Sequence, residues 1–173
     1  MEKENHMNMR SLTLAAAMLA TAVALGGCNR GPDMNKVRAD VAKAQADGQK
    51  MIADAQAKYD KVVADNNKSV ADSQADANKS NANANANGNA NAPANNGDDV
   101  AKARADAAQK LADAQYDVDK AKAEAAYNVA QAQCEAQTGD AEKSCKDSAK
   151  STYDSAVSAA KAKNADAHQR NQA

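Results

Sequence analysis

Three cysteines and His168 are the residues of this chain whose chemistry depends most on spacing. Cys134 and Cys145 lie eleven positions apart, which excludes a CxxC redox site. With His168 as the only histidine after residue 27, the chain is also short of ligands for a metal site. On one continuous helix the two Cα atoms would lie about 16 Å apart, whereas a disulfide needs less than about 7 Å. The pair therefore predicts either a chain reversal or bonds to a second molecule.

The residues between these two cysteines contain a turn signal. Gly139 can adopt the left-handed conformation that ends a helix, and Asp140 can cap the helix that follows. Cys134 precedes Gly139 by five positions, and Cys145 follows Asp140 by five. We therefore expect an antiparallel helical hairpin in which Cys134 and Cys145 bond to each other. The alternative is an unbroken helix whose cysteines each bond another molecule.

The N-terminal region has the pattern of an export signal. Lys3 and Arg10 precede an apolar run from Leu12 to Leu25. A helix of about 14 residues spans about 21 Å, which is short of the roughly 30 Å hydrocarbon core of a bilayer. The run is therefore typical of a secretory signal peptide, which we place at residues 1–27. Export to an oxidising compartment makes a disulfide the expected state of the other two cysteines.

The residues Leu25-Gly26-Gly27-Cys28 resemble the lipobox of bacterial lipoproteins. The resemblance implies cleavage between Gly27 and Cys28 by signal peptidase II and attachment of acyl chains such as palmitate to Cys28. An ordinary signal peptide with a chance cysteine is the alternative. Asn29 is not the Asp that favours inner-membrane retention in enteric bacteria, which implies the periplasmic face of the outer membrane. Residues 28–32 would then be a lipidated tether to the membrane.

Composition excludes a compact enzyme fold. After residue 27 the chain has seventeen large apolar residues (nine Val, four Tyr, two Met, one Leu and one Ile). Burial contributes about 1.5–3 kcal/mol per large side chain, which does not offset about 1–2 kcal/mol of backbone entropy per ordered residue. Abundant alanine favours helix, so we predict an all-α fold of long, solvent-exposed helices. We expect no catalytic residues and no cofactor or metal site, because carboxylates are spread evenly and there is no phosphate loop.

Charge gives no sign of a nucleic-acid partner. The formal net charge is −1, and Lys alternates with Asp along every segment. Phosphate binding needs positive charge clustered on one face. We therefore expect a solvated helix surface crossed by ion pairs.

Apolar spacing divides the remaining chain into three segments. Residues 33–80 are predicted as a helix that is capped by Asp33. Its apolar pattern thins out after Asn66-Asn67, and we expect the helix to fray at its end near Ser80. Residues 81–97 alternate Asn and Ala, which predicts a flexible, disordered linker. Residues 98–173 are predicted as the helical hairpin. Its first helix has an apolar stripe at Val100, Ala103, Ala107, Lys110 or Leu111, Ala114, Val118, Ala121, Ala125, Val129 and Ala132, and its second at Ala149, Tyr153, Ala156, Ala160 and Ala167. The stripe predicted for residues 33–80 is Val37, Val41, Ala44, Gly48, Met51, Ala55, Lys58 or Tyr59, and Val62.

The segment from Tyr127 to Tyr153 resembles a motif of small envelope proteins of beta- and gamma-proteobacteria, which are often labelled uncharacterised or TolA-like. The layout is also similar to the major outer-membrane lipoprotein, although the sequence ends at Ala173 without the terminal Lys that joins that protein to peptidoglycan. The resemblance implies a non-enzymatic structural or interaction lipoprotein with an envelope protein or peptidoglycan as partner, and leaves a homo-oligomer open. A largely disordered stress-protective protein of the late-embryogenesis-abundant type is the alternative, suggested by an eleven-residue period from Tyr116 to Tyr127.

Overall fold

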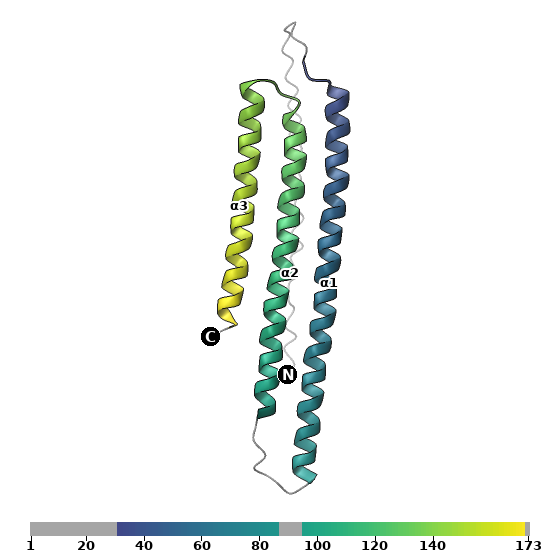
Figure 1. The fold of residues 1–173 in the computed structure, drawn as a ribbon, viewed down its shortest axis with the longest axis vertical. Coiled ribbons are helices and arrows are strands. Elements are labelled where there is room, and N and C mark those ends of the chain that lie inside the picture. Colours follow the sequence, from purple (N-terminus) through teal and green to yellow (C-terminus); the bar gives the residue numbers. More distant parts are fainter. Residues whose placement is uncertain (1–30, 87–94, 172–173) are drawn as a thin grey trace, which may run out of the picture. The chain divides into compact units, whose positions relative to one another are not determined.

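The described part of the protein is built from three helices. The computed structural model describes residues 31–86 and 95–171. Helix α1 spans Met34–Ala86, α2 spans Asn95–Cys134 and α3 spans Asp140–Arg170, and these residues contain no strand (Figure 1). The all-α prediction is confirmed. The predictions for residues 1–30, including Gly27 and Cys28, lie outside the described residues.

Helix α1 starts where the sequence predicts. The Oδ1 atom of Asp33 accepts hydrogen bonds from the backbone N–H groups of Asn35 (2.9 Å) and Lys36 (3.3 Å). The first N–H groups of a helix have no partner inside it, so an Asp before the first turn stabilises the helix end. The predicted cap at Asp33 is confirmed.

The predicted linker is too long at both ends. Helix α1 does not fray at Ser80 but continues to Ala86, and α2 begins at Asn95 instead of Asp98. Adding a residue to an existing helix needs no new nucleus. In residues 81–86 every second residue is also alanine, the best helix former. Both helices therefore extend into residues that we predicted as a linker from their composition alone. Residues 87–94 lie outside the description.

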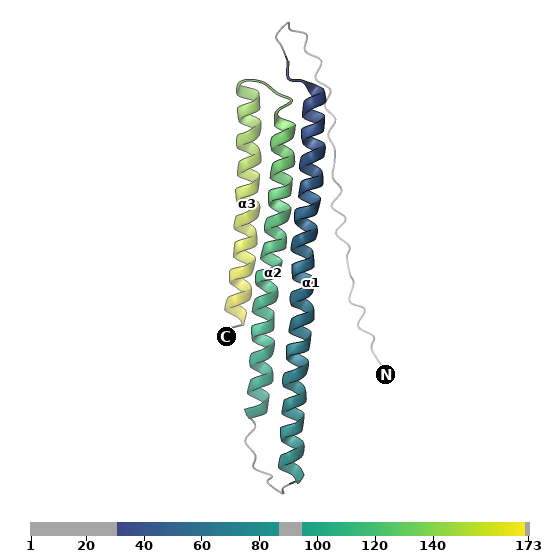
Figure 2. The same cartoon turned by 45° about the vertical axis from the view of Figure 1, so that its right-hand side comes forward.

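In the described part of the chain, helix α2 lies between α1 and α3 (Figures 1 and 2). It contacts both neighbours, whereas the described residues of α1 and α3 do not contact each other. Neighbouring helices run in opposite directions (Figure 1). Helix α2 must therefore offer two contact surfaces on opposite sides. Six members of its predicted stripe are buried: Val100, Ala107, Ala114, Val118, Ala125 and Ala132. Of these, Ala107, Ala114 and Ala125 lie beside residues of α1.

The contact stripe on α1 extends further than predicted. Asn66 is buried with 4% of its surface exposed, and Ala77 eleven positions later is also buried. The same interval links Val37 to Gly48, and both are buried. Eleven residues make almost three turns, so this interval keeps the stripe on one side of a nearly straight helix. Two positions of the predicted stripes each have two candidate residues. Tyr59 and Leu111 are half-buried, whereas their alternatives Lys58 and Lys110 are exposed.

Helices α1 and α2 approach each other closely at Gly48. A Cβ atom added there would lie 2.8 Å from the Cβ of Ala125 and 3.3 Å from its Cα. These distances are too short for ordinary van der Waals contact, so only glycine fits without displacing α2. The glycine therefore lets two alanine-rich helices pack backbone to backbone.

Candidate functional site

The turn between α2 and α3 differs from the predicted turn in detail. Helix α2 ends at Cys134, and Gly139 takes the N-cap position of α3 with φ 60° and ψ −134°. Gly139 thus has the predicted positive φ, but it starts α3 instead of ending α2. Asp140 lies inside the first turn of α3, and no side chain caps this helix. Its carboxylate acts there through the positive helix end, and not as the predicted cap.

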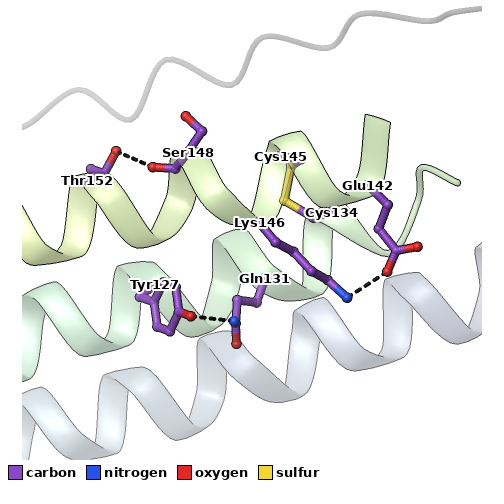
Figure 3. Close-up of a disulfide and its surroundings, with 8 residues drawn as sticks. All are labelled: Tyr127, Gln131, Cys134, Glu142, Cys145, Lys146, Ser148 and Thr152. Atoms are coloured by element: carbon purple, nitrogen blue, oxygen red, sulfur yellow. Dashed lines mark hydrogen bonds and ion pairs between the residues drawn. A yellow bond between two sulfur atoms is a disulfide. The ribbon is translucent and has the colours of Figure 1, made fainter. Parts of the chain in front are cut away.

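The disulfide joins the last residue of α2 to the second turn of α3. The Cα atoms of Cys134 and Cys145 lie 5.6 Å apart, inside the usual range for a disulfide (Figure 3). Cys134 has 1% of its surface exposed, and Cys145 is half-buried. Thiol–disulfide exchange requires access to a sulfur atom, so burial of Cys134 suits a structural cross-link.

Two tyrosines pack together inside the same helical pair. The ring centroids of Tyr127 on α2 and Tyr153 on α3 lie 5.2 Å apart with the planes inclined by 32°. Gln131 Nε2 donates a hydrogen bond of 2.6 Å to Tyr127 Oη, which fixes that ring about two turns from the disulfide (Figure 3). Aromatic pairs at such distances contribute about 0.5–1.5 kcal/mol beyond the burial of their surface. The rings and the disulfide therefore hold the turn end of α2 and α3.

An uncharged groove runs along α2 and α3 beside the disulfide. It has a volume of about 730 Å³ and is lined by fifteen side chains, none of which is Asp, Glu, Lys or Arg. Six of them are alanines: Ala123, Ala126, Ala130, Ala141, Ala149 and Ala156. The polar members are hydroxyl and amide groups such as Ser148, Thr152 and Gln133. In a chain with 26% charged residues, a groove without charge is a distinct surface.

Polar contacts hold the other end of α3. Asp113 Oδ1 on α2 accepts a hydrogen bond of 3.0 Å from Asn164 Nδ2, and His168 Nε2 lies 2.8 Å from the same oxygen. An ionised carboxylate can only accept, so the His168 tautomer with hydrogen on Nε2 is the donor. Lys163, which is next to Asn164 in the sequence, has its Nζ atom 3.7 Å from Asp119 Oδ2 on α2. His168 therefore belongs to α3 and contacts α2.

The Asp113 carboxyl has a perturbed pKa. Partial burial raises its pKa, but the hydrogen bonds from His168 and Asn164 lower it by more, and the net pKa is below the usual value. At the turn end, the hydrogen bond from Lys146 to Glu142, 2.6 Å long, raises the pKa of Lys146. Both shifts stabilise the charged forms that make these contacts.

Some residues of the helix interfaces are missed by the sequence reasoning. Asn66 Nδ2 donates a hydrogen bond of 2.8 Å to the backbone oxygen of Ala107 across α1 and α2. Its position eleven residues before Ala77 is the signal that could identify it. Tyr116 and Tyr127 do share the α3 side of α2, as their spacing predicts. Ala156, predicted to pack on α2, is exposed at the groove.

Within residues 31–86 and 95–171, no three His, Cys, Asp or Glu side chains gather as metal ligands would. None of the helices described there has an apolar stretch long enough to cross a bilayer. Comparisons with protein-family models, curated proteins and solved structures found no match for this chain.

Proposed function

We propose that this chain is a non-enzymatic structural or interaction lipoprotein of the bacterial cell envelope, held on the periplasmic face of the outer membrane by acyl chains on Cys28. The observation that carries the proposal is the pairing of long helices through small residues. Helix α1 has 53 residues and extends about 80 Å at about 1.5 Å per residue. Such helices hold a surface at a distance from their anchor and enclose no chamber for a reaction.

The surface of the helices supports a role in the solvent. Opposite charges four positions apart pair along all three helices, for instance Lys43 with Asp47, Lys102 with Asp106, and Lys150 with Asp154. Each exposed pair contributes only about 0.2–0.5 kcal/mol to helix stability, but the pairs keep the exposed sides polar. Among the described residues, only Val118 and Cys134 have less than 2% of their surface exposed. The protein is thus organised as a polar scaffold with a thin interior.

Contacts between helices favour this function over the stress-protective alternative. The hydrogen bond from Asn66 to Ala107 and the disulfide each join residues of different helices. A chain that is disordered until drying has no use for a buried side chain that fixes one helix against another. Circular dichroism in dilute buffer separates the two: stable helix supports the scaffold, and helix that forms only on drying or membrane contact supports the alternative.

Intact-mass measurement of the processed protein tests the anchor. We expect residues 1–27 to be absent and acyl mass to be present on Cys28, with the protein in the outer-membrane fraction. Cys28→Ser should abolish both the added mass and the membrane fractionation. The matched control, Cys134→Ser, should keep the acyl mass and the membrane fraction. An unmodified thiol at residue 28 in the wild-type protein would overturn the lipoprotein proposal.

A further inference from the structure

The uncharged groove between α2 and α3 is the surface that the packing described above leaves unused. It extends over residues 123–134 of α2, Gln137 in the turn and residues 141–156 of α3, about 22 Å along α3. Charged residues lie beside it on α3, where Asp147, Lys150 and Asp154 line a separate surface hollow. Its walls are alanine methyl groups, hydroxyl groups, amides and parts of the two tyrosine rings.

We propose that this groove is the contact surface between two copies of the chain. The argument rests on charge. In a twofold contact each residue near the axis meets its own copy, so any charged side chain there would face a like charge. The lining of this groove has no charged member, so it can meet itself without repulsion. On the ion-paired sides of the helices, by contrast, any charged side chain at the axis would meet its own copy.

Helix direction also favours a second copy. When two antiparallel pairs meet across a twofold axis that runs along the helices, α2 of each copy lies beside α3 of the other. All neighbours in the resulting four-helix bundle are then antiparallel, which is the usual arrangement of such bundles. The turns of both copies lie at the same end. The second copy thereby supplies the further layer that the row of helices lacks.

The side chains of the groove suit close helix contact. Alanine and serine let helix backbones approach closely, as Gly48 and Ala125 do between α1 and α2. The groove is also continuous with the α2–α3 interface, because Tyr127, Cys134, Cys145 and Tyr153 line both. The second copy would therefore cover the exposed parts of the same disulfide and tyrosine pair.

A photocrosslinking amino acid at Ser148 of the full-length chain tests the contact in cells. Ser148 is exposed and lines the groove, whereas Ser151, three positions later, is exposed outside it. We expect a crosslinked species of twice the chain mass from position 148 and none from position 151. A product that contains only another protein, or no product from position 148, overturns the proposal.

Native mass spectrometry of the full chain released from detergent gives the second measurement. Ser148→Glu places two carboxylates at the twofold contact and should weaken the dimer at least about tenfold. Ser151→Glu adds the same charge to the same helix and should leave the dimer unchanged. Equal melting temperatures of the two variants show that folding is not the cause. A wild-type chain that is monomeric at every concentration, or equal dimer fractions in both variants, overturns the proposal.

Discussion

The two helix interfaces of this protein use opposite means to join similar alanine-rich helices. Between α1 and α2, contact is spread along the helices through small residues and a glycine, with a buried hydrogen bond from Asn66 to Ala107. Between α2 and α3, the covalent bond and the hydrogen bonds lie at the ends, with a disulfide at the turn and Asp113 with its partners at the far end. The first interface is stabilised by its length and not by a covalent bond, since many small contacts add up over about 40 residues. The shorter α3 gains less from such contacts and depends on fixed points.

Removing the disulfide should have the largest effect on this difference. Cys134→Ser with Cys145→Ser should destabilise the α2–α3 pair by about 3 kcal/mol, because the bond restricts the unfolded chain. Hydrogen exchange should then become faster in α3 and stay nearly constant in α1. The oxidised wild-type protein in the same buffer is the control. Equal acceleration in all three helices would show that the disulfide does not hold the α2–α3 interface separately from the α1–α2 interface.

Substitution of Gly48 tests the close contact of α1 with α2. Gly48→Leu should lower the free energy of unfolding by about 1–3 kcal/mol, because the new side chain has no space beside Ala125. Leucine has a higher intrinsic helix propensity than glycine, which by itself would raise the free energy of unfolding. A lower free energy of unfolding would therefore show that the new side chain overlaps Ala125. The control, Ala53→Leu, changes an exposed position of the same helix and should have little effect. In a double-mutant cycle, Ala125→Gly should partly rescue Gly48→Ala.

Loss of the Asn66 side chain should have a smaller effect. Asn66→Ala removes one buried hydrogen bond and should cost about 1 kcal/mol in denaturant unfolding. Asn67→Ala is a close control, because the adjacent side chain is exposed. Equal stability of the two variants would mean that the bond to Ala107 does not fix the register of α1 and α2.

The sequence indicates elements better than it indicates partners. Helical periodicity and alanine content predict α1 and α2, and Asp33 marks where α1 starts, because these are local properties. The end of α1 at Ala86 is not predictable from composition, since propagation from a stable helix overrides the weak local preference. The roles of Asn66 and His168 depend on the register of one helix against another. No local pattern encodes that register. From sequence alone, an Asn within an apolar stripe therefore predicts that the stripe ends there.

Acid should produce the smallest effect, at the far end of α3. Because the pKa of Asp113 is lower in the folded protein, its contribution to stability is complete above the ordinary carboxyl pKa of about 3.9 and is lost as the pH falls through the folded value. More than half of the Asp113 side chain is exposed, so solvent screening limits the contribution to less than about 1 kcal/mol.

The carboxyl chemical shift of Asp113 in an NMR titration measures this pKa directly. His168→Ala and Asn164→Ala should each raise it, because each removes a donor to Oδ1. In Cys134→Ser with Cys145→Ser, these contacts and the ion pair of Lys163 with Asp119 remain as polar contacts of α3 with α2, so acid should release α3 more readily than in the disulfide-bonded chain. If acid releases α3 equally in both proteins, the two ends of α3 act independently, and the interface is not held jointly by its fixed points.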